Sequence, residues 1–480
     1  MEKESEKTIG AASSNNSASK SILSIKEKIG FSLGDAASNI YFQTFIIFML
    51  NFYTDVFGLP AAAVGTMFLV TRIFDAVNDP IMGAISDRVN TRWGKFRPFI
   101  FFFGIPLVIM GVITFSTPDY DVSGKLVYAY ITYNLLMVMY TIVNVPYSSL
   151  MAVITPNSLE RTELSSYRFV AAFGGGLIVQ GSTIYLVKYF GKGNDAVGWQ
   201  WAMACLGGLA LIFLFITFIT TKERVHPPKN QSFEFKKDLK ELFSNKPWLL
   251  IAGATVFQLI FIVMRNSSIV YYFKYYILDQ KLEIFGNSIA LTYADFTSSF
   301  LLTGTIFTII GAILTKWISK RFDKKNTYVG SLFISVVGSI LFFFLEPENV
   351  KLIYLINIIV SFAWGPVSVL QWAMYTDAAD YSEWKNGRRA TGLLMAASLF
   401  ALKLGLTLGG ALVGYILAYF SFVANQTQTA EAINGIIMLM SVYPAVFGVI
   451  GVVMMLFYPL NNKMMTKIET ELNIRRAEAV

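Results

Sequence analysis

The residues best suited to chemistry lie in one short run, Arg72-Ile-Phe-Asp75-Ala-Val-Asn78-Asp79-Pro80. Asp75 and Asp79 are four residues apart, so a helix would place both carboxylates on one face, with Cβ atoms about 5–6 Å apart. In a medium of low dielectric, two such carboxylates cannot both stay ionised unless a cation joins them; otherwise one takes up a proton. Hard oxygen ligands suit Na⁺, Li⁺ or H⁺ better than transition metals. The run therefore predicts a site for a small cation. The alternative is a structural ion pair in which Arg72 neutralises Asp75.

A second group of polar residues is spread over several apolar segments. Lys403 lies near the middle of its segment, too deep for its ammonium to reach the surface easily. Amides, acids and cations that meet inside a membrane suit a hydroxyl-rich ligand, because each sugar hydroxyl both donates and accepts hydrogen bonds. Helix–helix contacts for the amides and interfacial anchoring for the aromatic residues remain alternatives. The candidate substrate-binding residues of this group are Asp35, Asn39, Asn144, Arg168, Arg265, Gln371, Trp372 and Lys403.

A third cluster combines acids and bases at one end of a segment. It begins with Asp377, Asp380 and Glu383 and continues to Arg388 and Arg389. We expect it to face a basic loop that carries Arg88, Arg92 and Lys95. Ion pairs that form in one state and break in another are typical of conformational switching, so the two clusters predict an inner gate. The alternative is a solvated loop whose surface ion pairs contribute about 0–1 kcal/mol each.

The composition places these groups in a membrane protein. Of the 480 residues, 55% are hydrophobic and only 15% are charged, whereas soluble domains carry about 25% charged residues. One histidine and one cysteine exclude a histidine-rich metal site and an internal disulfide. No His-Glu-x-x-His, Gly-x-Ser-x-Gly or phosphate-binding loop is present, so we expect no enzyme and no covalent cofactor.

Apolar runs follow one another along the chain with short polar breaks. The predicted spans are 31–57, 62–86, 98–117, 126–151, 165–188, 199–220, 247–277, 291–315, 327–345, 352–377, 391–420 and 433–458. The predicted organisation is a disordered N-terminal tail (1–28), a six-helix bundle (29–221), a central loop (222–246), a second six-helix bundle (247–459) and a C-terminal tail (460–480). Two parallel six-helix halves are the architecture of the major facilitator transporters, so the predicted fold class is an all-α membrane protein of that kind.

The loop charges predict the orientation. Alternate breaks between spans are rich in lysine and arginine, as at Arg88–Arg97, Lys222–Lys240 and Lys320–Lys325. Positive residues in short loops stay cytoplasmic, so we expect a multi-pass protein of a bacterial-type inner membrane with both termini in the cytoplasm. The net charge of +8 then reflects membrane topology, and we expect no nucleic acid partner.

The chain resembles the glycoside–pentoside–hexuronide:cation symporters, the melibiose-permease group of major facilitators. The likeness rests on Tyr53-Thr54-Asp55-Val56, on the run Arg72–Gly83, on Arg92–Pro98, on Asn144-Val145-Pro146-Tyr147 and on Asp377–Arg389. It implies that Asp75 and Asp79, with Asn78 and Thr141 nearby, hold the coupling cation, which is Na⁺, Li⁺ or H⁺. It also implies symport of a sugar or glycoside with that cation by alternating access, with membrane lipids as the surrounding partner.

The sequence departs from this group at the sugar site. Where the melibiose-permease group presents carboxylates, this chain carries Asn39 and Asn144, and Ser148 and Ser368 replace two tryptophans. We include Ser148 among the candidate substrate-binding residues. The loss of two acids makes the site more positive, which favours an anionic sugar or a differently bound pentoside as a hypothesis. A cation-independent sugar facilitator or a lipid carrier on the same fold remains the alternative function.

Overall fold

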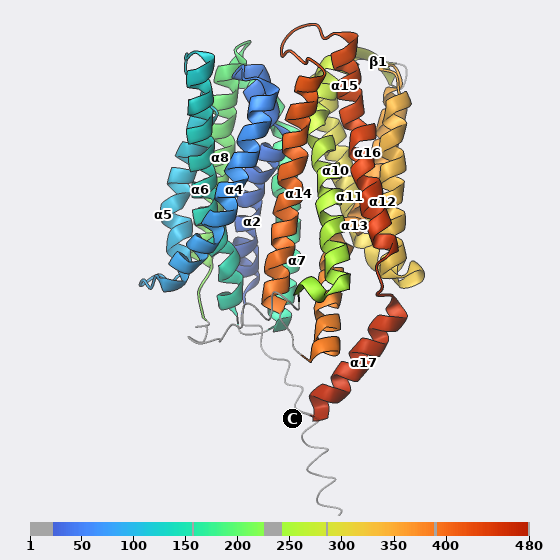
Figure 1. The fold of residues 1–480 in the computed structure, drawn as a ribbon. Coiled ribbons are helices and arrows are strands. Elements are labelled where there is room, and N and C mark those ends of the chain that lie inside the picture. The colour runs from blue at the N-terminus through green and yellow to red at the C-terminus, as the bar shows by residue number, and fades with distance from the viewer. Residues whose placement is uncertain (1–22, 156–157, 225–241, 285–286, 388–390, 479–480) are drawn as a thin grey trace, which may run out of the picture.

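The structure is a computed structural model that describes residues 23–155, 158–224, 242–284, 287–387 and 391–478. Within this part of the chain the helices group into twelve long rods, which run side by side in two halves (Figure 1). Most of the predicted N-terminal tail and central loop, together with Arg388 and Arg389, lies outside the described residues.

The first half contains six rods. They are α2 to η1 (α2 Ile25–Ile47, α3 Met49–Asn51, η1 Phe52–Val56), α4 (Ala61–Arg88), α5 (Arg97–Thr114), α6 (Val122–Ile154), α7 (Ser158–Gly191) and α8 (Asp195–Thr220). Side-chain caps mark several starts, since Ser24, Asp121 and Asn194 each accept a hydrogen bond from the first turn of the helix that follows.

The second half repeats this arrangement. Its rods are α10 with η2 (Lys246–Tyr271, Tyr272–Ile277), α11 (Tyr293–Phe322), α12 with η3 (Lys324–Leu341, Phe342–Phe344), α13 (Val350–Asn386), α14 (Thr391–Tyr419) and α15 with α16 (Ala430–Met440, Val442–Leu456). A short hairpin of β1 (Gln280–Ile284) and β2 (Asn287–Leu291) joins η2 to α11, with Gln280 opposite Leu291. The sequence predicted only a polar break between the two spans there, without strands.

The rods coincide with the predicted spans, but several extend beyond them, by nine residues at the end of α13 and by seven at the start of α7 and at the end of α11. In the described part of the chain, ten helical segments are long and apolar enough to cross a membrane. The two rods outside this set are α2 to η1, which contains Asp35, and α4, whose segment Ala61–Arg72 is apolar but shorter.

The predicted C-terminal tail contains a further helix, α17 (Asn462–Glu478). Its side chains Met465, Ile468 and Leu472 recur at helical spacing and are buried against the second half. Glu471 accepts a hydrogen bond from the indole of Trp384, at 2.6 Å. These buried side chains and the hydrogen bond to Trp384 hold α17 against the end of α13.

The two halves meet near the predicted outer face, where η1 and η2 end. There α4 and α14 approach so closely that a Cβ on Gly65 would lie 2.8 Å from the carbonyl oxygen of Ala411, and one on Gly414 would lie 2.5 Å from that of Ala61. Beside them the hydroxyls of Thr66 and Tyr415 lie 2.9 Å apart. Glycine at these positions therefore permits a tight closure between the halves.

Candidate functional site

The predicted cation site is assembled from α4 and α6. The Thr141 hydroxyl of α6 donates to the carboxylates of Asp75 and Asp79 at 3.3 and 3.1 Å. Because these acids are one turn apart on α4, one hydroxyl reaches both. The Asp75 side chain is 5% exposed, and that of Asp79 is 28% exposed. The pair therefore has one deeply buried member and one that remains accessible.

Two basic side chains contact the same acids. Arg72 Nη1 lies 3.1 Å from Asp75 Oδ2, as the structural alternative from the sequence requires. Lys403, on α14 of the other half, donates a hydrogen bond to Asp79 and lies 3.8 Å from Asp75 Oδ2. The charges of the two acids and the two bases in this cluster cancel. The acids are thus paired here, and one of the pairs bridges the two halves.

Asn78 lies between the two acids in sequence, and its Nδ2 is buried without a hydrogen-bond partner. Buried amide donors normally make a hydrogen bond, so the Asn78 amide is free to bind another group in this conformation. Lys403 stands with these cation-site residues, whereas the sequence analysis assigned it to the substrate.

A second ion pair connects α2 and α7. Arg168 donates from Nη2 to Asp35 Oδ1 at 3.1 Å and from Nε to Asp35 Oδ2. The guanidinium also lies over the rings of Phe31 and Tyr147, with distances of 5.7 and 5.4 Å to the ring centroids. A bidentate contact of this kind holds both planes in a fixed orientation. Two predicted substrate residues therefore form one rigid unit.

The predicted amides lie near this pair. Asn144 accepts a hydrogen bond from Ser38 at 3.1 Å, and Asn39 donates to the backbone carbonyl of Asp35 at 3.0 Å. Ser148, one turn beyond Asn144 on α6, is exposed. Asn39, Asn144 and Ser148 therefore share one region of the first half with Asp35.

Two other predicted substrate residues are occupied inside the second half. Gln371 is 4% exposed and accepts a hydrogen bond from Gln258, which in turn accepts one from Tyr328. Trp372 packs edge-on against Tyr375, with ring centroids 6.0 Å apart. In this conformation neither is brought to Asp35 or to the acidic pair.

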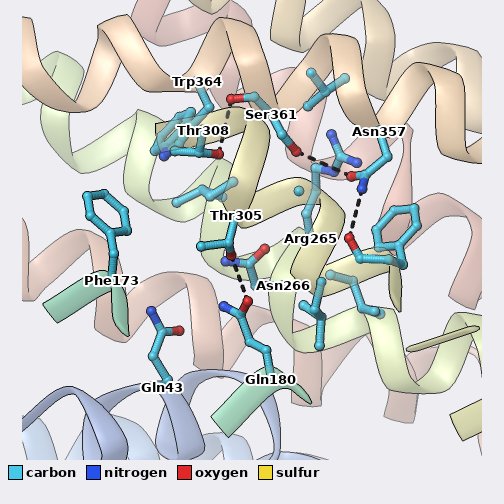
Figure 2. A pocket seen from close by; sticks show the side chains of 16 residues that line it. Gln43, Phe173, Gln180, Arg265, Asn266, Thr305, Thr308, Asn357, Ser361 and Trp364 are labelled. Carbon is cyan, nitrogen blue, oxygen red and sulfur yellow. Dashed lines mark hydrogen bonds between the residues drawn. The ribbon is translucent and has the colours of Figure 1, made fainter. Parts of the chain in front are cut away.

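Arg265 lines a separate cavity of about 170 Å³ between the halves (Figure 2). Gln43 and Gln180 come from the first half, and Thr305 and Asn357 come from the second. Thr305 donates to Gln180 at 2.6 Å and so crosses the interface. The sequence analysis missed all four of these residues, because isolated amides and threonines in apolar helices carry no distinctive spacing.

Among the described residues of the predicted inner gate, the structure gives contacts for Asp377 and for the backbone of Lys95. Asp377 accepts hydrogen bonds from Lys324 of its own half at 2.8 and 2.9 Å. On the other side, Glu223 accepts the backbone N–H groups of Lys95, Phe96 and Arg97 at 2.8, 2.8 and 3.1 Å.

The structure also places four other residues of the predicted gate. Arg92 lies over the ring of Trp93 at 4.6 Å, and Arg88 is exposed at the end of α4. Asp380 and Glu383 lie on α13 beyond Asp377. Arg388 and Arg389 lie outside the described residues. The inner gate therefore remains a prediction.

A polar closure that was not predicted from the sequence lies at the predicted outer face. Asp55 of η1 lies 2.6 Å from Lys274 of η2 and also accepts a hydrogen bond from Tyr275. Thr54 and Tyr271 lie 2.8 Å apart, and Asn425 donates to the backbone carbonyl of Asp55. The ion pair joins the two halves, and its carboxylate is 1% exposed.

Both partners of this ion pair lie on π-helical turns at equivalent places in the two halves. Phe57 donates to the carbonyl of Phe52, and Leu278 donates to that of Phe273, each at 2.9 Å. Such turns are frequent at functional sites. The available sequence signal was two aromatic-rich runs near the ends of these rods, one with an acid and one with a lysine: Phe52-Tyr53-Thr54-Asp55 and Tyr272-Phe273-Lys274-Tyr275.

Comparison with known proteins shows the family and the fold of this chain. A family model described as "MFS/sugar transport protein" matches residues 30–462. The putative glycoside/cation symporter YagG of Escherichia coli (strain K12) is 37% identical over 95% of this chain and 96% of its own length. The isoprimeverose transporter of Lactiplantibacillus pentosus is 35% identical over 94% of this chain and 92% of its own length.

A solved structure shows the same fold. It is a bacterial homolog of the human lysosomal transporter Spinster in an inward-facing and unoccupied conformation, with a TM-score of 0.64 and 14% identity over 92% of this chain and 97% of that one. The family match confirms the sequence prediction of a transporter rather than an enzyme. The chain belongs to the MFS/sugar transport protein family, the glycoside:cation symporters of the major facilitator fold.

Proposed function

We propose that this protein takes up a sugar or glycoside together with Na⁺ or H⁺, by alternating access of its two halves. One observation carries the proposal. Asp75, Asp79 and Thr141 of the first half converge on one point, and Lys403 of the second half reaches the same point. A cation that binds these acids therefore acts directly on a contact between the halves.

The donor set fits a small hard cation. Carboxylate and hydroxyl oxygens are the ligands that Na⁺ prefers, and either acid can also take a proton. The site needs no rearrangement of α4 against α6, because Thr141 already holds both carboxylates. The names of the relatives, a glycoside/cation symporter and an isoprimeverose transporter, support a saccharide as the co-transported solute.

Lys403 provides a physical basis for coupling. Its ammonium and an incoming cation compete for Asp79, so cation binding weakens the bridge between α4 and α14. A cation that favours one conformation must raise substrate affinity if the substrate favours the same one, and the reverse holds equally. We propose that Asp35, Arg168, Asn39, Asn144 and Ser148 form the sugar site that completes this exchange.

The conformation supports a transport cycle with one side open at a time. Contacts between the halves, among them Asp55–Lys274, Thr66–Tyr415 and Gln180–Thr305, lie toward the outer face. Asp79 and Lys403, at 28% and 34% exposure, remain partly accessible. We propose that this face is periplasmic in a bacterial-type inner membrane, with the chain termini in the cytoplasm, as the loop charges predict.

The test is uptake by the purified protein in proteoliposomes. Labelled methyl β-D-xyloside and methyl β-D-glucoside are offered with an inward Na⁺ gradient, an inward proton gradient or neither. We expect accumulation only with one of the gradients. In Asp79→Asn we expect accumulation to fall at least tenfold, whereas Asp119→Asn, on an exposed outer loop, leaves it unchanged.

Two results would contradict the proposal. Uptake that equilibrates without regard to any ion gradient would identify a facilitator. Movement of a fluorescent phospholipid across the bilayer, with no saccharide uptake, would identify a lipid carrier.

A further inference from the structure

Arg265 differs from the other cationic side chains that lie deep among the helices. Arg72, Arg168, Lys274 and Lys403 each contact a carboxylate. Arg265 is 3% exposed, and within the described part of the chain it makes no salt bridge. Its Nη1 is buried without a hydrogen-bond partner.

The aromatic rings beside Arg265 compensate only part of this cost. Its guanidinium carbon lies 5.0 Å from the ring centroid of Phe342 and 6.0 Å from that of Phe261. Such contacts stabilise a cation only modestly, whereas a buried charge without a counter-ion is strongly destabilising. Arginine remains protonated at physiological pH, so it does not avoid this cost by becoming neutral. The residue therefore needs an anion.

The cavity that Arg265 lines is polar and is shared by both halves (Figure 2). Many of its other polar groups already have partners. Asn357 donates to the carbonyl of Phe300 at 3.0 Å, Thr308 donates to the carbonyl of Ser361 at 3.1 Å, and Thr305 donates to Gln180. Among the described residues that line this cavity, Arg265 carries the one charge, and none is acidic.

The surroundings of Arg265 also suit a saccharide. Gln43 and Asn266 contribute amides, and Trp364 contributes an aromatic face. At about 170 Å³ the cavity is far larger than the 10–15 Å³ that a single water needs. A guanidinium binds a carboxylate or a sulfonate through two parallel N–H bonds, which fixes the orientation of a ring that carries such a group.

We propose that this cavity is the subsite for an acidic substituent of the transported glycoside, with Arg265 as its counter-ion and a hexuronide as the substrate class. The inference rests on the proposed function. It separates two tasks: Asp35 and Arg168 neutralise each other at one site, and Arg265 holds the charge of the substrate at another. The cavity contains residues of both halves, so a bound substrate would contact both.

The experiment compares three probes that differ only at carbon 6 of the sugar. Methyl β-D-xyloside lacks this carbon, methyl β-D-glucoside carries a hydroxymethyl group there, and methyl β-D-glucuronide carries a carboxylate. Binding to the purified protein is measured by calorimetry at saturating Na⁺ and, separately, at pH 6. We expect the glucuronide to bind at least tenfold more tightly than the glucoside.

Variants then assign the preference to Arg265. Arg265→Gln should lose the preference for the glucuronide while binding of the xyloside changes less than threefold. Arg265→Lys keeps the charge without the planar fork, so part of the preference should remain. Arg321→Gln, the same change at the exposed end of α11, should behave as the wild type.

The outcomes distinguish the two proposals. If the wild type binds the xyloside or glucoside and the glucuronide neither binds nor competes, the subsite proposal is overturned and the proposed function stands. If no glycoside binds and none is taken up with any gradient, the proposed function fails first. If Arg265→Gln does not fold, the test uses Arg265→Lys and the binding of the three probes to the wild type. An Arg265→Lys variant with unchanged preference for the glucuronide would count against a bidentate contact from the guanidinium.

Discussion

At the scale of single residues, the hydroxyl of Thr141 connects the two acids. Because it bonds to both Asp75 and Asp79, we expect this hydroxyl of α6 to be a ligand of the bound cation. We expect Thr141→Ala to weaken cation binding about fivefold, since one such bond contributes about 1 kcal/mol. The measurement is the Na⁺ concentration at half-maximal glycoside binding.

Two variants control this prediction. Thr141→Ser should restore the wild-type midpoint. Thr132→Ala, on the same helix but bonded to the backbone of Tyr128 at 2.8 Å, should not change it. An unchanged midpoint in Thr141→Ala would remove Thr141 from the cation site.

Lys403 gives a prediction of the opposite sign. If its ammonium competes with the cation for Asp79, Lys403→Gln should bind Na⁺ several-fold more tightly than the wild type, while accumulation of glycoside falls because the cross-half contact is lost. Lys403→Arg should retain the weaker binding. Equilibrium binding of ²²Na⁺ tests this, and weaker binding in Lys403→Gln would show that the lysine supports the site instead.

The identities of these residues could be predicted from the sequence, but their partners could not. The i, i+4 spacing places Asp75 and Asp79 together whatever the tertiary structure is. Lys403 is more than 300 positions away, and its place depends on how α14 lies against α4. Arg265 shows the same limit, because a lone arginine in an apolar run gives no sign of which cavity it lines.

At the scale of elements, the π-helical turns η1 and η2 position the outer ion pair. An extra residue in the turn changes the direction of the side chains that follow it, and here it brings Asp55 to Lys274. Asp55→Asn removes a buried, charge-assisted contact and should increase the outward-open population several-fold. The readout is labelling, by an impermeant thiol reagent from the outer side, of Asn266→Cys in a Cys205→Ser background.

Lys274→Gln should accelerate this labelling in the same way, because it breaks the same pair. Asp119→Asn should not. If Asp55→Asn and Lys274→Gln both label at the parental rate, the ion pair does not hold the outer face closed.

The elements themselves follow closely from hydropathy. Apolar runs of about 20 residues can bury their backbone in lipid only as helices, so the twelve rods were predictable. The hairpin Gln280–Leu291 and α17 were not, because both depend on tertiary contacts of short segments. The π-helical turns were likewise missed, since helical periodicity does not distinguish them from regular turns.

At the scale of the whole molecule, the two halves are in contact on the predicted outer side. Thr66 and Tyr415 are in contact across the halves there. We therefore expect Thr66→Cys with Tyr415→Cys, in the Cys205→Ser background, to be joined by a short bifunctional thiol reagent. Transport should stop on cross-linking and return on reduction, whereas each single variant treated alike should keep its activity.

Cation and glycoside together should change the cross-linking rate, since they drive the cycle through a state in which this contact opens. A pair that cross-links while uptake continues unchanged would show that the outer ends do not separate during transport. The sequence could predict the two sets of six spans, and their orientation in the membrane stays a prediction from the loop charges. It could not predict which side is closed, because both conformations bury nearly the same apolar residues.

The helices α4 and α14 carry two features at different depths, the glycine contact of Gly65 with Gly414 and the bridge from Asp79 to Lys403. Both helices continue without interruption between these levels. If the glycines serve as a pivot, a small separation at the lysine becomes a larger angular swing at the far ends of the two rods. Binding of a single ion, no wider than a water molecule, would in this way change the angle between two helices about 30 Å long, at about 1.5 Å of length per residue.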